Sequence, residues 1–198
     1  MSILIAIPTG SHVENDVFVA LWKLDKAGHD VDMAIMKGYE VDDERNDLVE
    51  YALGKGYEYV MFVDSDTVPP QDALKNMLEH DADVVFGYYQ ASNGDDGVTC
   101  LCKSQRQGDA FSGSELHEME SRGEHLIDVW RGGFGCALVR ASLFGKLERP
   151  YFKFVYRQDG TKLSEDYYFC FACRKAGVKI YADTRVACKH ILRDVVEI

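Results

Sequence analysis

The sequence predicts an α/β fold with a mostly parallel central sheet flanked by helices. Over the first 90 residues, short apolar runs alternate with segments of helical periodicity, a pattern typical of βαβ units. The run Tyr59–Val63 is apolar throughout and lacks the alternation of a half-exposed strand, which favours a strand buried on both faces of a parallel sheet. A length of 198 residues suits one domain, and no linker divides the chain.

The first half contains four strands and three helices in the prediction. Apolar residues recur at helical spacing between the strands, Gly28 is a natural helix stop, and an acidic turn suits the start of the second helix. We expect strands at 3–7, 31–36, 59–63 and 84–89, and helices at about 17–27, 43–53 and 70–79.

The second half is predicted to hold a small antiparallel element. It opens with a polar loop at 92–97, and the stretch 105–124 has few apolar residues; such stretches are often functional or mobile. Ser164 is a good N-cap for a helix that stops at Gly177. We expect strands at 98–103, 126–130, 136–139, 151–156, 178–182 and 185–189, and a helix at 164–175.

The charge and the termini restrict the function and the location. With 33 acidic against 22 basic residues, the formal charge of −11 argues against a nucleic-acid partner and favours a cation wherever an anionic ligand binds. The N-terminus does not resemble a signal peptide, and no stretch is apolar for the roughly 18 residues that a membrane span requires. We therefore expect a cytoplasmic protein without a membrane span.

The six cysteines form two close pairs and two single residues. Cys170 and Cys173 have the spacing of half a zinc site or of a redox pair. However, Cys100 and Cys102 are separated by one residue, and Cys170 and Cys173 fall inside a predicted helix. Because free cysteine is among the most commonly buried residues, packing is the favoured interpretation.

The most informative motif is Asp64-Ser65-Asp66, which directly follows the apolar run 59–63. In open α/β sheets, ligands collect outside the carboxyl ends of the strands. Two carboxylates at that edge could hold Mg²⁺ or Mn²⁺, which prefer oxygen ligands and share them with substrate phosphates. The alternative is a solvated turn or the cap of the next helix.

Four motifs in this order resemble the GT-A nucleotide-sugar glycosyltransferases, particularly those similar to glycosyltransferase family 2. They are the opening strand and turn 5–9, the acidic tripeptide 64–66, the glycine-rich segment 130–136, and Ser164-Glu165-Asp166-Tyr167 followed by His190. The resemblance covers nearly the whole chain. It implies a single GT-A domain over 1–198, with a nucleotide-binding half at about 1–90 and an acceptor-binding and catalytic half at about 91–198.

The resemblance also implies roles for individual residues. Asp166 is the expected catalytic base. A divalent cation, Mn²⁺ or Mg²⁺, would be bound by Asp64, Asp66 and His190. The expected donor-binding residues are Pro8, Thr9, Arg45, Asp64 and Ser65, and the expected acceptor-binding residues are Tyr89, Trp130, Gly133 and Glu165.

Structural explanations remain open for several of these residues. Arg45 could lie in an exposed first helical turn, and Trp130 and Tyr89 could pack in the core. Gly133 could form a turn or bulge. A capping Ser164 explains the carboxylates after it through the helix dipole, which would lower the pKa of Asp166.

The expected function is metal-dependent transfer of a sugar from a nucleoside-diphosphate sugar, most often a UDP-sugar, to a hydroxyl of a carbohydrate, protein or small-molecule acceptor. A base candidate favours inversion. Since the chain ends eight residues after His190, we expect an open acceptor side or one completed by a second chain, which allows for a homo-oligomer. The alternatives are a nucleotidyltransferase of similar fold and a catalytically silent nucleotide-sugar-binding module.

Overall fold

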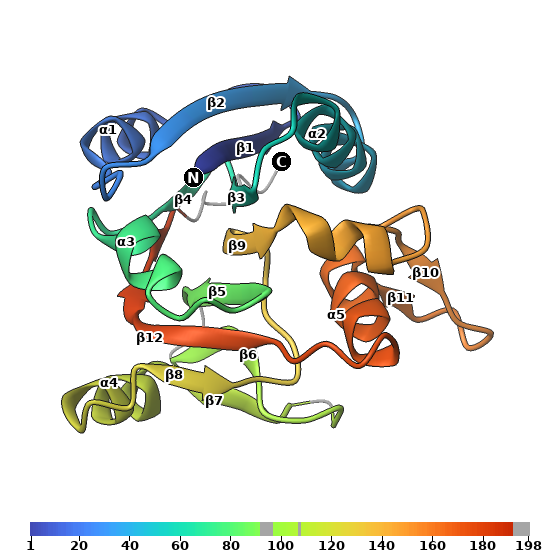
Figure 1. Ribbon diagram of the computed structural model, residues 1–198. Coiled ribbons are helices and arrows are strands. Elements are labelled where there is room, and N and C mark those ends of the chain that lie inside the picture. The colour runs from blue at the N-terminus through green and yellow to red at the C-terminus, as the bar shows by residue number, and fades with distance from the viewer. Residues whose placement is uncertain (92–96, 107, 192–198) are drawn as a thin grey trace, which may run out of the picture.

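The computed structural model describes residues 1–91, 97–106 and 108–191 and is built around a seven-stranded sheet of order β2-β1-β3-β9-β5-β12-β8 (Figure 1). Five strands run in one direction: β1 (Ser2–Thr9), β2 (Asp30–Lys37), β3 (Tyr59–Val63), β5 (Val84–Tyr88) and β12 (Tyr181–Ala187). Two run against their neighbours: β8 (Leu126–Asp128) and β9 (Cys136–Arg140). The predicted α/β fold with a mostly parallel sheet is confirmed.

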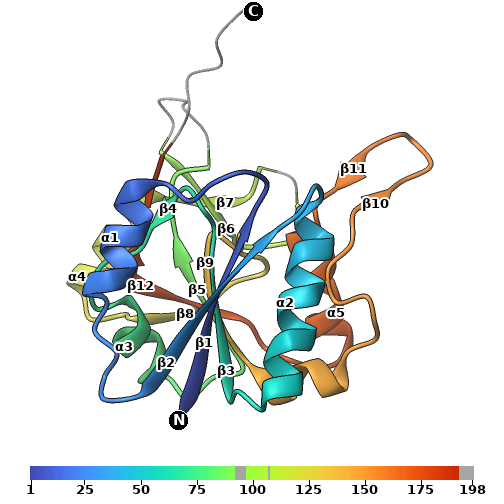
Figure 2. The ribbon, with the colours of Figure 1, turned by 90° about the horizontal axis from the view of Figure 1, so that it is seen from above.

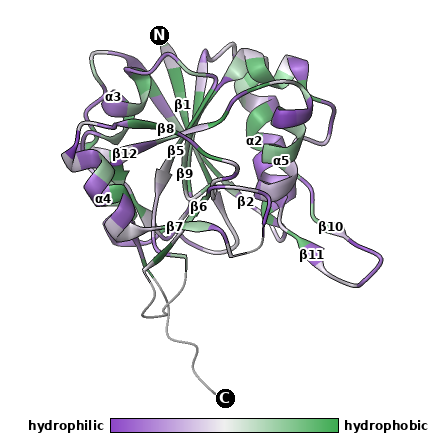
Figure 3. Cartoon of the chain, turned by 90° about the horizontal axis from the view of Figure 1, so that it is seen from below, coloured by the Kyte–Doolittle hydropathy of each residue, from purple (hydrophilic) through white to green (hydrophobic). Residues whose placement is uncertain are grey.

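Helices cover both faces of the sheet (Figures 1 and 2). One face packs against α1 (Asn15–Lys23) and α3 (Ala73–Leu78). The other packs against α2 (Val41–Lys55), the 3₁₀ helix η1 (Ala141–Lys146) and α5 (Glu165–Lys175). The apolar residues of the strands fill the centre, as Figure 3 shows by hydropathy. Within the described residues, no helix combines the length and the apolar character that crossing a membrane requires.

Three two-stranded sheets supplement the main one, and they supply the predicted antiparallel element. They pair β4 (Thr67–Val68) with β13 (Lys189–His190), β6 (Val98–Cys102) with β7 (Ala110–Ser112), and β10 (Val155–Tyr156) with β11 (Lys162–Leu163). The β10–β11 hairpin projects beside α5 (Figure 2).

The polar stretch 105–124 departs from its expectation because it contains the helix α4 (Gly113–Ser121) as well as β7. The helix begins with a capping box, in which Ser112 accepts a hydrogen bond from the Glu115 N–H and the Glu115 carboxylate accepts one from the Ser112 N–H. Ser-x-x-Glu is a helix-start signal, so the sequence carried the information. The predicted loop 92–97 lies mostly outside the described residues.

The other corrections concern bounds. The predicted strand 151–156 is a strand only at 155–156, because Asn46 of α2 binds the backbone of Tyr151 and Phe152 and holds it away from a sheet. The predicted strands 178–182 and 185–189 form the single strand β12, followed by β13. The first helix stops at Lys23 rather than at about residue 27, and the strand 126–130 ends at Asp128.

Candidate active site

The acidic tripeptide forms a tight turn at the carboxyl end of β3. The Asp64 N–H donates to the Gly135 carbonyl at 3.0 Å, which continues the pairing of β3 with β9. The Asp64 carbonyl accepts from the Thr67 N–H at 3.1 Å and closes the turn. Asp64 and Asp66 therefore lie just after the carboxyl end of a buried inner strand, where ligands bind in open α/β sheets.

The β4–β13 pairing brings His190 to this turn from a distant part of the chain. His190 lies opposite Thr67, and the Ile191 N–H donates to the Asp66 carbonyl at 2.8 Å. His190 Nε2 is 3.7 Å from Asp66 Oδ1, and the His190 ring packs on Tyr89 with centroids 5.1 Å apart. The interaction with the Asp66 carboxylate raises the pKa of His190.

Helix α5 supplies the second acidic pair. Ser164 caps it as predicted, and its hydroxyl accepts from the Tyr167 N–H at 3.3 Å. Burial raises the pKa of Asp166 to about 7 against the charge of Arg45, and the charges of Glu165 and Asp64 add to the rise. The helix dipole would lower the pKa of Asp166, but burial and the neighbouring carboxylates outweigh it.

One arginine joins the two acidic groups. The Arg45 guanidinium donates to Asp64 at 2.8 and 3.1 Å, to Asp166 at 2.9 Å, and also to Glu165. Its side chain is 2% exposed. Three carboxylates that would otherwise repel one another are thus held around a single buried cation.

Aromatic rings form the floor beneath this cation. The Arg45 guanidinium carbon lies 5.4 Å from the ring centre of Phe134 and 5.9 Å from that of Phe152, within cation–π range. Burial alone would lower the pKa of Arg45, but the charges of Asp64, Asp166 and Glu165 outweigh it and raise that pKa. Arg45 is therefore permanently charged.

Two cavities meet at the acidic turn. One of about 240 Å³ is lined by Pro8, Thr9, Gly10, Tyr39, Val41, Glu44, Asp64, Ser65 and Asp66. The other, of about 340 Å³, is lined by Asp64, Asp66, Tyr89, Ala91, Cys100, Arg131, Gly132, Gly133, Ser164, Asp166 and His190. Asp64 and Asp66 line both, so a molecule in each cavity would meet its neighbour at these carboxylates.

Two of the three predicted cation ligands, Asp66 and His190, lie side by side at this junction. Within residues 1–91, 97–106 and 108–191, no group of three or more His, Cys, Asp and Glu side chains could hold a metal ion. Asp66 Oδ1 and His190 Nε2 nevertheless lie 3.7 Å apart, within ion-pair distance. Divalent cations are often held by one or two protein groups and completed by water and substrate phosphates.

The structure brings most of the predicted residues to these cavities, but not all. Pro8, Thr9 and Ser65 line the smaller cavity, and Tyr89 and Gly133 line the larger one. Trp130 lines neither; the guanidinium of Arg174 covers its ring at 4.2 Å. Arg45 and Glu165 lie buried behind the cavity wall, bonded to each other.

Sequence reasoning missed three polar residues of the larger cavity as site residues: Arg131, Cys100 and, in any role beyond a cap, Ser164. Arg131 stands next to Gly132-Gly133, so the glycine-rich segment was a signal for it. Cys100 carried no such signal, since its position depends on the hydrogen bond from its N–H to the Tyr89 carbonyl. Burial raises the pKa of the Cys100 thiol to about 12.

The mostly parallel sheet with helices on both faces matches the GT-A-like fold of solved structures. This confirms the predicted fold. No family model and no curated protein matches the chain.

Solved structures share the fold at low sequence identity. A197 from STIV is 19% identical with a TM-score of 0.65, and the alignment covers 98% of this chain and 87% of A197. S. aureus TarS 1-349, crystallised in complex with UDP-GlcNAc, is 16% identical with a TM-score of 0.59, covering 98% of this chain and 59% of that one. A second TarS structure is 17% identical with a TM-score of 0.57, covering 97% and 37%.

Proposed function

We propose that this chain is a metal-dependent glycosyltransferase that transfers a sugar from a UDP-sugar to an acceptor hydroxyl with inversion. The observation that carries the proposal is the meeting of two cavities at Asp64 and Asp66, with Asp166 and His190 in the larger one. The binding of UDP-GlcNAc by TarS, which shares the fold, supports a UDP-sugar as donor.

The smaller cavity is the proposed nucleotide site. Pro8 and Thr9 end the first strand and Ser65 lies in the acidic turn, so all three line the space next to the shared carboxylates. A diphosphate extending from that cavity would reach the facing side chains of Asp66 and His190. A divalent cation bound there would act as a Lewis acid on the leaving diphosphate.

Asp64 has a second partner in this scheme. Its carboxylate accepts two hydrogen bonds from Arg45 Nη2, at 2.8 and 3.1 Å. This pairing fixes the orientation of Asp64 and neutralises part of its charge. We therefore assign Asp66 and His190 as the principal cation ligands, and we assign Asp64 to the wall between the two cavities.

Asp166 is the proposed catalytic base. It lines the larger cavity, and burial raises its pKa to about 7, close to the pH at which a base works most efficiently. Arg45 holds one of its oxygens, which fixes the orientation of the carboxylate. An acceptor hydroxyl next to Asp166 would give up its proton as the hydroxyl oxygen attacks the anomeric carbon.

The test is a thermal-unfolding screen of UDP, UDP-GlcNAc and other nucleotide sugars with and without Mn²⁺, followed by assays of UDP release. A ligand at 100 times its Kd stabilises the folded state by about 2.7 kcal/mol, or roughly 5–10 °C for a chain of this size. We expect this shift for a UDP ligand only when Mn²⁺ is present.

Asp66→Ala should abolish the Mn²⁺-dependent shift. Asp43→Ala is the matched control, because it removes the same charge from an exposed position on α2. The proposal fails if no nucleoside diphosphate stabilises the protein, or if both variants respond like the wild type. Binding without turnover over a broad acceptor panel would instead favour the silent binding module.

A further inference from the structure

We propose that a cleft between α5 and the β10–β11 hairpin binds an apolar alkyl or aryl group of the acceptor. This inference rests on the proposed function and narrows its acceptor class. The cleft has a volume of about 330 Å³ and is separate from the two cavities of the active site. Figure 1 shows the hairpin lying alongside α5.

The lining of this cleft is mainly aromatic and aliphatic, and we call it the apolar cleft. Val155 and Leu163 come from the hairpin, and Tyr167, Tyr168 and Phe171 come from α5. Phe171 is 50% exposed. An aromatic side chain left half in water at the mouth of a cleft gains free energy when a ligand covers it, because apolar area is removed from water.

The apolar cleft adjoins the catalytic cavity. Leu163 and Tyr167 line the cleft, whereas Ser164 and Asp166, between them in the sequence, line the cavity. Arg131 lines the cavity, and its guanidinium carbon lies 5.5 Å from the centre of the Tyr167 ring, which lines the cleft. An acceptor with its hydroxyl at Asp166 would therefore have the apolar cleft beside it, past Arg131 and Tyr167.

The catalytic cavity and the apolar cleft differ in the side chains that line them, and this difference indicates which kind of acceptor would bind. The catalytic cavity offers carboxylates, an imidazole and a guanidinium, which suit a sugar or another polar head. Within the apolar cleft, the polar side chains are those of Gln105, Arg157 and the two tyrosines, and Gln105 donates to the Tyr167 hydroxyl at 3.5 Å. An amphipathic acceptor matches both sides.

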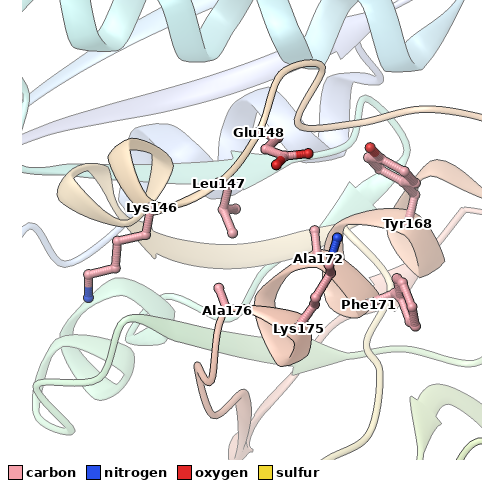
Figure 4. A pocket seen from close by; sticks show the side chains of 8 residues that line it. All are labelled: Lys146, Leu147, Glu148, Tyr168, Phe171, Ala172, Lys175 and Ala176. Carbon is pink, nitrogen blue, oxygen red and sulfur yellow. The ribbon is translucent and has the colours of Figure 1, made fainter.

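A second cleft borders the apolar cleft and shares Tyr168 and Phe171 with it. It lies on the other side of Tyr168 and Phe171, between α5 and η1, and Figure 4 shows Lys146, Glu148 and Lys175 around it. None of its lining residues lines the catalytic cavity. We therefore confine the apolar group to the hairpin side of Phe171.

The test compares two matched probes by calorimetric titration. n-Octyl β-D-glucoside, kept below its micelle concentration, carries the apolar group, and methyl β-D-glucoside lacks it. Burial of several methylene groups should make the octyl compound bind at least about tenfold more tightly. Phe171→Ser should remove most of this difference.

Phe18→Ser is the matched control, since Phe18 of α1 is 53% exposed and lies away from the cleft. It should keep the preference for the octyl compound, and thermal unfolding should show both variants folded. Equal affinity for the two glucosides, no measurable octyl glucoside binding, or equal effects of the two substitutions would overturn the inference. Mn²⁺-dependent UDP binding, measured on the same samples, tests the proposed function separately.

Discussion

At the scale of single residues, the proposed base Asp166 gives the most specific prediction for the larger cavity. A pKa of about 7 leaves it partly protonated at neutral pH, although its neighbour Arg45 favours the charged form. As a base it acts only when ionised. We therefore expect kcat/KM to rise about tenfold per pH unit below 7 and to level off above it.

Asp166→Asn should lower kcat by about 10²- to 10⁴-fold and remove this rise with pH. The substitution should also affect stability. Because the folded-state pKa lies above the ordinary value of 3.8, the stability present below that value is lost as pH rises through about 7. The asparagine variant should therefore show a smaller loss of melting temperature between pH 5 and pH 8. An unchanged activity profile would remove Asp166 from the base role.

Arg45 is the residue on which the acidic cluster depends. Its replacement by methionine leaves Asp64, Glu165 and Asp166 together without a cation, and losing one member of a buried ion pair costs about 3–5 kcal/mol. The loss should shrink at pH 5, where the carboxylates can take up protons. Urea unfolding at pH 5 and pH 8 measures both effects.

Arg122→Met provides the control, because Arg122 is 60% exposed and pairs only with Glu118 of the preceding helix α4 among the described residues. Its effect on the free energy of unfolding should stay below about 1 kcal/mol. Equal losses for the two variants would show that Arg45 does not neutralise the cluster.

The sequence predicted which residues gather at the candidate site better than it predicted the burial and the neighbours of each one. The acidic residues and His190 are visible as motifs in the sequence, and the structure gathers them at one cavity. The environment of Asp166 was not predictable, since its burial and the approach of Arg45 depend on α2 packing beside α5. A helix-dipole argument considers one helix alone, so it could not establish whether burial and neighbouring carboxylates raise the pKa of Asp166.

At the scale of elements, strand β9 and the glycine-rich segment before it shape the larger cavity. Gly135 lies directly before β9, where an added Cβ would stand 2.6 Å from Tyr89 Cε1 and 2.7 Å from Thr67 Oγ1. Gly135→Ala should therefore displace Tyr89 and with it the ring packed on His190. We expect a loss of about 1–3 kcal/mol in unfolding free energy and weaker Mn²⁺-dependent UDP binding.

Gly145→Ala is the control for this prediction. A Cβ at Gly145 in η1 would have no heavy atom within 4 Å, so its effect should stay within about 0.5 kcal/mol. Urea unfolding of both variants, with calorimetric titration of UDP, provides the measurements. Unperturbed UDP binding in Gly135→Ala would contradict the proposed link from β9 to the cation site.

Elements of the first half were predictable because each one is local and periodic. The strand 151–156 was not, because three hydrogen bonds between the Asn46 side chain and the backbone of Tyr151 and Phe152 replace a ladder there. The sequence also did not reveal that β9 runs against its neighbours. An apolar run predicts burial, and its direction depends on the connections around it.

The whole molecule has its most protected strands at the centre of the sheet. β9 is bonded to β3 on one side and β5 on the other, and all three are almost fully buried. β2 lies at the edge and is largely exposed. In hydrogen exchange, the amides of β3, β5 and β9 should be the slowest and those of β2 clearly faster.

Mass spectrometry of the exchanged protein checks this order. Equal protection of β2 and β9 would mean that β2 is covered in solution, as by a second copy of the chain. At this scale the mostly parallel sheet was predictable from alternation, whereas the order of its strands was not, since it depends on contacts between residues far apart in sequence.

The β4–β13 pairing has a consequence for biosynthesis. The residues that line the smaller cavity all lie between positions 8 and 66 and are synthesised long before His190, and β13 forms only when residues 189–190 pair with 67–68. The imidazole of His190 therefore reaches Asp66 only after residues 189–190 have been synthesised and have paired with β4.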